Sequence, residues 1–295
     1  LSTPGVGGKS FGRVAIIGLG YVGITLAATL AKKGVVVVGL DKNPAVVKQL
    51  GNGRCHIYEP GVEPILKKYL GSRLFLDTEL PNEPVDAAIL CVSTPLNSMT
   101  QAPDLENLRA AAKLVADAYS PGPLVVVRST VPVGATRAVV LPELLARWGR
   151  AQLAFSPERT IQGQALQELE ELPQIIGGLD QASRDAAAVL FSRLTDRVVL
   201  VSSLEAAEMV KLVNNCHTDL IYSFGNEVAL MAERFGLDPL EVIRAANADY
   251  PRPDLAKPGF VGGGCLSKDP YILMSSTRAS GYSPWLVGHA RGLNE

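Results

Sequence analysis

Cys265 is the residue of this chain that is best placed for covalent chemistry. It follows Gly262, Gly263 and Gly264 and comes immediately before a stretch with helical spacing. Backbone amides and the dipole at a helix start favour the thiolate, the form in which cysteine acts as a nucleophile. An isolated cysteine is more often a small residue of the core. The pattern therefore leaves two interpretations of Cys265 open, a nucleophile and a packing residue.

Lysine, asparagine and aspartate side chains are spaced so that helices would group them. Asp269 lies four residues after Cys265, which in a helix places both on one face, and Lys268 is beside it. Lys211 and Asn215 have the same spacing on another helical stretch. A lysine and an asparagine on one helix face are usually a solvated edge. Their importance depends on the other motifs that accompany them.

A glycine-rich motif near the start of the chain predicts a dinucleotide site. Three glycines in a GxGxxG pattern directly follow a strand and open a helix, and Asp41 ends the next strand. Small residues let the backbone approach a pyrophosphate, whose charge the helix N-terminus stabilises. The carboxylate of Asp41 would accept hydrogen bonds from ribose hydroxyls and repel a 2′-phosphate, which favours NAD over NADP. The alternative interpretation is that the glycines only form a tight turn. The predicted cofactor contacts of this motif are Gly18, Gly20, Tyr21, Val22, Gly23 and Asp41.

Small hydroxyl residues follow two further strands, in the segments 92–95 and 128–132. Ligands of open α/β sheets bind at the carboxyl ends of strands, so these hydroxyls are candidate cofactor and substrate contacts. Strand ends followed by ordinary proline turns are the competing interpretation. The candidates are Ser93, Thr94, Ser129 and Thr130.

The scaffold for these residues is indicated by short β-branched runs that alternate with helical stretches from Arg13 onward. Such alternation is typical of a parallel sheet with helices on both faces. We therefore expect an α/β fold, a doubly wound Rossmann-like parallel sheet followed by a helical central domain. Expected strands are 13–18, 35–41, 73–77, 85–93, 124–130, 151–156 and 198–203, and expected helices are 21–33, 43–50, 61–70, 105–119, 135–148 and 181–194.

A long helix is expected over 203–235, because this segment lacks proline and has a steady apolar stripe. It is far longer than the ~12 residues of an average helix. We expect it to span the molecule or to join two subunits as a homodimer. Shorter helices are expected over 239–248 and 266–280. The expected domains are a flexible lead-in over 1–12, an NAD-binding domain over 13–202 and a helical central domain over 203–295.

Composition excludes several classes of partner. The 295 residues include 28 basic and 29 acidic side chains, a formal net charge of −1, so no overall field would collect nucleic acid or an anionic membrane. The opening segment lacks signal-peptide features, and no apolar run is long enough for a membrane span. Four cysteines and three histidines form no metal-ligand pattern. We therefore expect a cytoplasmic protein without a metal, whose partner is a small molecule.

Five short motifs keep an order and spacing that occur together in one known family. They are RSTVPVGATR (128–137), SPERTIQG (156–163), AAEMVKLVNN (206–215), FGNEVA (224–229) and GGGCLSKD (262–269). From about Arg13 to its end the chain resembles the UDP-glucose and UDP-N-acetylhexosamine 6-dehydrogenases. The resemblance implies an NAD-dependent, four-electron oxidation in which the C6 hydroxymethyl group of a nucleotide sugar becomes a carboxylate.

The resemblance implies a covalent mechanism on Cys265. A first hydride leaves C6 for NAD and gives an aldehyde. Cys265 then adds to the aldehyde, because a thiohemiacetal can surrender a second hydride and become a thioester, whereas a bare aldehyde cannot. Lys211 and Asn215 would donate hydrogen bonds to the oxygen as negative charge develops. Two NAD are consumed for each sugar.

Hydrolysis of the thioester is assigned by the resemblance to three further residues. Asp269 orients water and protons, while Thr130 and Glu158 hold the water or relay its proton. Lys268 is an expected cofactor contact. The expected substrate contacts are Glu158, Arg159, Lys211, Asn215, Arg252 and Gly262.

The choice of sugar and two departures from the family depend on loop residues. The segment Ser156-Pro-Glu-Arg159, with Gly163 following, looks more like the acetamido-sugar branch than the glucose branch. We therefore expect a UDP-N-acetylhexosamine, with UDP-glucose and a dTDP-sugar as alternatives. Phe260 stands where relatives usually have glycine. The resemblance also implies a third, nucleotide-binding domain, and we expect this chain to be either a fragment without that domain or an unusually short member of the family.

Two other functions are compatible with the motifs. A two-electron β-hydroxyacid dehydrogenase also pairs a Rossmann domain with a helical domain and a catalytic lysine four residues before an asparagine. It needs no cysteine and forms one NADH per substrate. A non-catalytic NAD-binding fragment that dimerises through the long helix is the second alternative.

Overall fold

The computed structural model describes residues 11–251, 254–278 and 281–295. They form two compact units. The first unit comprises the described residues up to Pro95 together with Asp104–Glu208. The second comprises Leu96–Pro103 and Met209–Glu295. The sequence-based division between 202 and 203 placed residues 96–103 in the first unit and 203–208 in the second, the reverse of the structure. Segments this short change neither the composition nor the periodicity of the sequence around them. Residues 1–10 of the expected lead-in lie outside the described residues.

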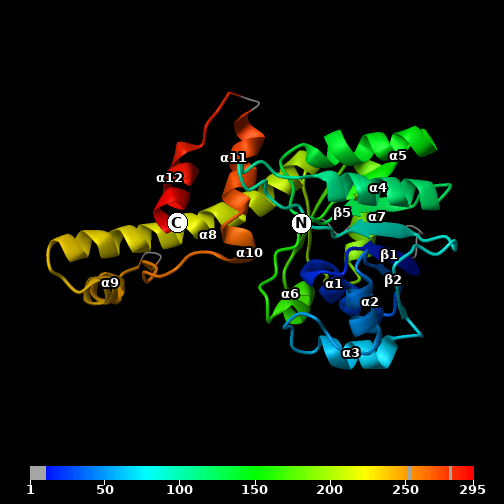
Figure 1. Cartoon of the computed structure of the whole chain (residues 1–295), viewed down its shortest axis with the longest axis horizontal. Helices are drawn as coiled ribbons and strands as arrows, with labels where there is room; N and C mark the ends of the chain where they lie inside the picture. The colour runs from blue at the N-terminus through cyan, green and yellow to red at the C-terminus, as the bar shows by residue number, and fades with distance from the viewer. Residues whose placement is uncertain (1–10, 252–253, 279–280) are drawn as a thin grey trace. The chain divides into compact units, whose positions relative to one another are not determined.

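The first unit is built on one sheet, which has eight strands among the described residues (Figure 1). Their order is β3-β2-β1-β4-β5-β6-β7-β8, and the pairing is parallel except between β6 and β7. The order reverses between β1 and β4, and ligands of open α/β sheets bind outside the carboxyl ends at such a reversal. The strands are β1 Arg13–Ile17, β2 Val36–Leu40, β3 Leu74–Asp77, β4 Ala87–Leu90, β5 Leu124–Val127, β6 Gln152–Phe155, β7 Gln174–Gly178 and β8 Val198–Leu200.

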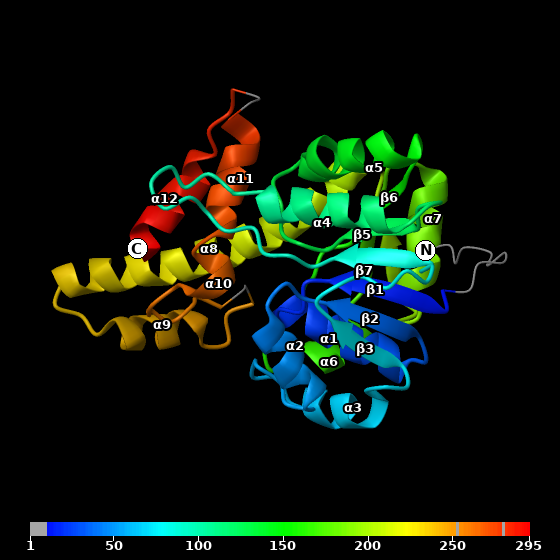
Figure 2. The same ribbon diagram turned by 45° about the vertical axis from the view of Figure 1, so that its right-hand side comes forward.

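Helices cover both faces of the sheet. Figure 2 shows α4 and α5 on one side and α1, α2 and α3 on the other. The core on the α1 side includes fully buried Ile16, Leu30 and Leu66, so the apolar stripes of the helices pack on β-branched strand residues. The predicted doubly wound Rossmann-like fold is confirmed. The helices are α1 Tyr21–Lys32, α2 Pro44–Gly51, α3 Val62–Tyr69, α4 Glu106–Ala118, α5 Leu141–Trp148, α6 Ala165–Glu171 and α7 Gln181–Phe191.

Three local features differ from the sequence-based expectation. Helix α6 and the antiparallel strand β7 were not predicted: α6 has seven residues and no side-chain cap, and all five residues of β7 are buried and end in two glycines. Such short segments carry too little periodicity to be recognised. The helix expected over 135–148 is divided into a π-helical turn, Thr136–Val140, and α5, whose second residue is Pro142. Proline has no N–H to continue the preceding hydrogen-bond ladder.

The second unit is helical. It contains helix α8, Leu204–Arg234, from Met209 onward, because the first five residues of this helix belong to the first unit. The 31 residues of α8 confirm the predicted long helix. It is followed by α9 Pro239–Asn247, α10 Gly263–Leu266, α11 Asp269–Arg278 and α12 Trp285–Asn294. Helices α11 and α12 pack against each other (Figure 1). No helix in the described part of the chain is long and apolar enough to cross a membrane.

The helix that was expected from about residue 266 begins differently, and this corrects the placement of Cys265. Cys265 lies inside the one-turn helix α10, and α11 begins only at Asp269. Pro270 explains the interruption, because it lacks the N–H that would bind the carbonyl of Leu266 in a continuous helix. Cys265 and Asp269 therefore do not share the face of one helix. Cys265 is exposed, whereas Asp269 is buried.

Candidate active site

The glycine loop after β1 has the shape of a phosphate site. Gly18 has φ +94°, and a Cβ there would lie 2.7 Å from the carbonyl oxygen of Cys91. A Cβ on Gly23 would overlap the carbonyl oxygen of Gly18, whereas one on Gly20 would meet no atom within 4 Å. Gly18 and Gly23 are thus required by packing, and Gly20, the N-cap of α1, leaves an open approach to the helix N-terminus. This cradle fits a dinucleotide pyrophosphate.

Asp41 and Tyr21 brace this loop. The carboxylate of Asp41 accepts hydrogen bonds from the backbone N–H of Leu19 and of Asn43, both at 2.9 Å. A carboxylate has about four acceptor positions, so ribose hydroxyls can still bind. The Tyr21 hydroxyl lies 3.2 Å from Oγ1 of Thr160, and burial raises the pKa of Tyr21 to about 12. The Val22 side chain packs on the core, which leaves its backbone for the predicted cofactor contact.

The hydroxyl residues after β4 and β5 bind each other's backbone. Oγ1 of Thr94 donates to the carbonyl of Thr130 at 2.6 Å, and Oγ of Ser129 donates to the carbonyl of Val92 at 2.6 Å. Ser93, in contrast, is exposed and accepts a hydrogen bond from the amide of Asn107. Thr94 and Ser129 are buried and hold the two strand ends together, which supports the structural interpretation of their hydroxyls. Thr130 is half-buried at the same edge.

Arg128 and Glu158 form a buried ion pair, which the sequence did not reveal. Nη2 and Nε of Arg128 donate to Oε2 of Glu158 at 2.8 and 3.1 Å, and Oε1 accepts from the N–H of Arg159 and of Thr160. Burial alone would raise the pKa of Glu158, but the guanidinium and these hydrogen bonds hold it below its ordinary value. Both oxygens of the carboxylate therefore accept hydrogen bonds within the protein, and the proton relay by Glu158 stays a prediction. The available signal was an arginine directly after an apolar strand.

Two further carboxylates, also missed from the sequence, fix the loops of the family motifs. Glu59 accepts from the N–H of Gly163 at 2.7 Å and of Ala165 at 2.8 Å. Glu208 accepts from the N–H of Gly134 at 2.5 Å and of Thr136 at 2.8 Å. Both are buried, and burial raises the pKa of Glu208. A glutamate within an apolar helix segment was the signal that could have identified Glu208.

In the second unit, Lys211, Asn215 and Asp269 lie together. Nδ2 of Asn215 donates to Oδ2 of Asp269 at 2.5 Å. Asp269 is 1% exposed, and its Oδ1 has no hydrogen-bond partner in the described part of the chain. Burial raises the pKa of Asp269, and the Asn215 hydrogen bond and the charges of Lys211 and Lys268 oppose that rise. The fold thus forms the predicted group of ammonium, amide and carboxyl side chains.

The cysteine loop belongs to the same unit, and Cys265 lies four residues before Asp269 in the chain. The N–H of Lys268 donates to the carbonyl of Cys265 at 3.0 Å. Gly262 is the N-cap of α10, and the exposed ring of Phe260 lies against it. Cys265 is exposed, which favours the nucleophile over the packing interpretation. Arg252, the other predicted substrate contact of this region, lies outside the described residues.

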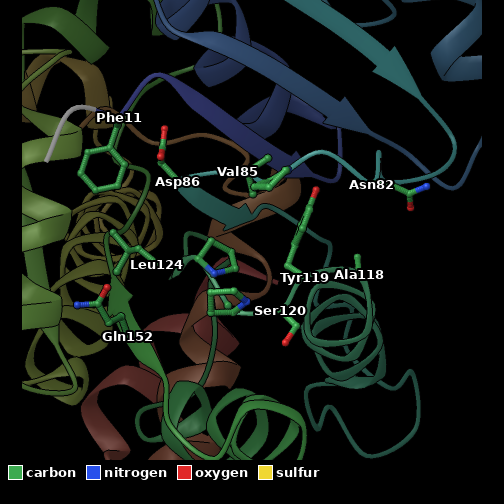
Figure 3. A pocket seen from close by; sticks show the side chains of 13 residues that line it. Phe11, Asn82, Val85, Asp86, Ala118, Tyr119, Ser120, Leu124 and Gln152 are labelled. Carbon is green, nitrogen blue, oxygen red and sulfur yellow. The ribbon is translucent and has the colours of Figure 1, made fainter.

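Nη1 of Arg159 donates to the carbonyl of Pro173 at 3.4 Å, within the first unit. A hollow of about 340 Å³ is found at the opposite edge of the sheet, beside the amino ends of β4, β5 and β6. Figure 3 shows Phe11, Asp86 and Tyr119 around it. Ligands of open α/β sheets bind at the carboxyl edge, so this hollow is not the active site. No group of three metal-ligating side chains occurs in the described residues.

The sheet, the glycine cradle and the acid after β2 define a Rossmann-type, NAD-binding oxidoreductase. The chain belongs to the UDP-glucose/GDP-mannose dehydrogenase family: residues 12–195 match the model of its NAD-binding domain and residues 205–295 match the model of its central domain. It is an NAD-dependent nucleotide-sugar dehydrogenase by class, as the motifs predicted.

Curated relatives and solved structures agree on this class. A UDP-N-acetyl-D-mannosamine dehydrogenase of Pyrococcus horikoshii is 35% identical over 96% of this chain and 68% of its own length. An NDP-N-acetyl-D-galactosaminuronic acid dehydrogenase of Ralstonia nicotianae is 33% identical over 97% of this chain and 69% of its own length. The structure of a UDP-D-ManNAc dehydrogenase from Pyrococcus horikoshii has a TM-score of 0.88 at 34% identity, over 96% of this chain and 68% of that one. The structure of a UDP-glucose dehydrogenase from Pyrobaculum islandicum has a TM-score of 0.85 at 30% identity, over 99% of this chain and 70% of that one.

Proposed function

We propose that this chain oxidises the C6 hydroxymethyl group of a nucleotide-diphosphate sugar to a carboxylate through a thioester on Cys265. The supporting observation is the group formed by Lys211, Asn215 and Asp269 in the unit that also presents the exposed thiol of Cys265. NAD supplies the hydride acceptor for both oxidations. The second oxidation needs a nucleophile that converts the aldehyde into a hydride donor, and a thiol does this.

The protein groups divide the remaining work. Sγ of Cys265 forms a bond to C6 of the aldehyde, and the ammonium of Lys211 and amide of Asn215 donate to the oxygen that becomes negative. Each well-placed donor of this kind contributes about 3–4 kcal/mol to transition-state stabilisation. Loss of the second hydride gives the thioester. Water then adds to the thioester carbon, and cleavage of its C–S bond releases the carboxylate and returns the thiol.

Asp269 is the proposed proton acceptor for that water. Its buried carboxyl has a raised pKa and an oxygen without a hydrogen-bond partner in the described part of the chain. Burial of a carboxyl moves its pKa toward the range in which acid–base catalysis is effective near neutral pH. Glu158, whose two oxygens accept hydrogen bonds within the protein, positions the loop 156–163. Thr130 remains the proposed water-holding hydroxyl.

The proposed substrate is a UDP-N-acetylhexosamine. The motif Ser156-Pro-Glu-Arg159 supports it, and both of the similar curated enzymes are named for acetamido sugars or their acids. UDP-glucose is the alternative, because the UDP-glucose dehydrogenase structure is nearly as similar. The sugar contacts proposed in the second unit are Lys211, Asn215 and Gly262, with Lys268 toward the cofactor.

The test is incubation of the chain with NAD and a panel of UDP- and dTDP-sugars, with and without acetamido groups. Two NADH and one uronic acid per sugar, with the Cys265→Ser variant forming no acid, are expected. One NADH per substrate would support the two-electron β-hydroxyacid dehydrogenase. No turnover, together with unselective alkylation of Cys265 that no sugar nucleotide slows, would support the non-catalytic NAD-binding fragment.

We also propose that the chain forms a homodimer through α8 in the cytoplasm. Apolar side chains exposed along this helix support the dimer, among them Ile221, Phe224, Leu230 and Met231. Exposed apolar surface of this extent is typical of a protein interface. Light scattering should give twice the chain mass, and Ile221→Glu should give the monomer mass. A monomeric wild-type chain at micromolar concentration would contradict the dimer.

A further inference from the structure

A buried arginine on the last helix holds the main chain on both sides of Cys265. The Arg291 side chain of α12 is 2% exposed. Nη1 donates to Oδ1 of Asp219 and to the carbonyl of Leu266, both at 2.8 Å, and Nη2 donates to the carbonyl of Val261 at 3.0 Å. Val261 precedes Gly262 and Leu266 follows Cys265. One guanidinium thus joins the two ends of the cysteine segment.

These carbonyls need an external donor. The carbonyl of Leu266 would bind the N–H of residue 270 in a regular helix, but residue 270 is proline. Val261 lies before the start of α10 and is buried, so its carbonyl has no helical partner either. A buried carbonyl without a hydrogen-bond partner destabilises the fold. The guanidinium satisfies both groups, and its planar fork fixes their separation.

Side chains from α8 complete this network. Oδ1 of Asn226 accepts from the N–H of Gly259 at 2.7 Å, and its Nδ2 donates to Asn294 at 2.9 Å. Nδ2 of Asn294 in turn donates to the carboxylate and the carbonyl of Asp219, both at 3.0 Å. Asp219 is 1% exposed and is the counter-ion of Arg291. The loop therefore rests on hydrogen bonds from two helices that carry no reacting group at these positions.

We infer that Arg291, held by Asp219, is a positioning residue that fixes the conformation of residues 259–266 and hence the place of the Cys265 thiol. This inference rests on the proposed function, in which that thiol attacks C6. Glycines at 262–264 cannot define the loop themselves, since glycine has the widest conformational freedom. The rigidity that nucleophilic attack requires must come from outside the segment.

The thiol offers a direct readout of loop geometry. Cys91 and Cys216 are buried, and desolvation raises the pKa of each to about 12. Burial also raises the pKa of half-buried Cys55. Cys265 is the exposed cysteine among the four, so mild alkylation reports on it.

The test compares Arg291→Lys with Arg244→Lys, whose arginine is exposed on α9 with a weak ion pair to Asp238 at 3.8 Å. Lysine at 291 keeps the charge beside Asp219 but cannot bind both carbonyls through a fork. We expect Arg291→Lys to speed amide hydrogen exchange over 259–268, to change the Cys265 alkylation rate and to lower kcat at least about tenfold, with a smaller change in sugar KM. NAD affinity should be unchanged, and Arg244→Lys should match wild type throughout.

Exchange and alkylation need no turnover, which separates the two proposals. A wild-type chain that forms no acid contradicts the proposed function. Faster amide hydrogen exchange in Arg291→Lys would still support the positioning of residues 259–266 by Arg291. Wild-type exchange, alkylation and kcat in a folded Arg291→Lys variant would overturn the inference. If that variant does not fold, Asp219→Asn, which leaves an oxygen to accept from Arg291, should show the same changes more weakly. Wild-type values in Asp219→Asn would then overturn it.

Discussion

The side-chain amide of Asn215 donates a hydrogen bond of 2.5 Å to Asp269, although 54 residues separate them in the chain. The contact joins α8 to the first residue of α11 and leaves the other oxygen of Asp269 without a partner in the described residues. A buried carboxyl in this state is more easily protonated than one in water. The proposed catalytic group is therefore also a source of instability when it is ionised.

Replacing Asp269 with asparagine should raise stability and abolish turnover. Burial raises the Asp269 pKa above 3.8, so the folded chain binds this proton more tightly than the unfolded chain. The free energy of unfolding must then fall as pH rises from that value through the raised pKa. Asp269→Asn removes this fall, and thermal unfolding at pH 5 and pH 8 measures it. Exposed Asp196→Asn is the control, and an Asp269→Asn variant less stable than wild type at pH 8 would refute the prediction.

Two glycines of the cofactor loop should fail in different ways when replaced with alanine. A Cβ on Gly23 meets backbone, so Gly23→Ala should lower the melting temperature of the chain without ligand and also weaken NAD binding. Gly20 has open space, so Gly20→Ala should keep the melting temperature while the added methyl hinders the pyrophosphate and weakens NAD binding. Calorimetry with and without NAD distinguishes these outcomes. Equal melting temperatures for both variants would contradict this account.

Neighbouring glutamates at the start of α8 should differ in their importance. Both oxygens of buried Glu208 accept backbone N–H groups, so the amide of Glu208→Gln would oppose a donor and cost roughly 1–3 kcal/mol. Glu205 forms a part-exposed ion pair with Arg137, and Glu205→Gln should cost less than about 1 kcal/mol. Urea unfolding measures both. A reversed order would show that burial does not govern this helix start.

The buried Arg128–Glu158 ion pair should make the stability effects of substitutions at these two residues strongly non-additive. Arg128→Met leaves a carboxylate buried without its counter-ion and should cost roughly 3–5 kcal/mol, most of which Arg128→Met with Glu158→Gln should recover. The pair holds the pKa of Glu158 below its ordinary 4.5, so its stabilisation is present above that pH and is lost as pH falls through the lowered pKa. Urea unfolding of wild type, of the single variants Arg128→Met and Glu158→Gln, and of the double variant at pH 7 and pH 4 measures both effects. Additive losses would contradict the pairing.

The sequence by itself determined the sheet, the glycine loop, the long helix and the family. Each depends on residues that are close together in the sequence. β-Branched runs alternate with helical stretches, GxGxxG follows a strand, and Cys265, Lys211 and Asn215 lie in short, uninterrupted motifs. These signals survive without knowledge of what packs against what.

Tertiary structure alone decided which side chains are free to react. Only the fold shows that Arg128 occupies Glu158, that Asn215 binds the buried Asp269, and that Arg291 holds the cysteine loop. The physical reason is that a carboxylate's role depends on its burial and its hydrogen-bond donors, which include a residue 30 positions away for Glu158 and one 74 positions away for Glu208. No local pattern carries that information.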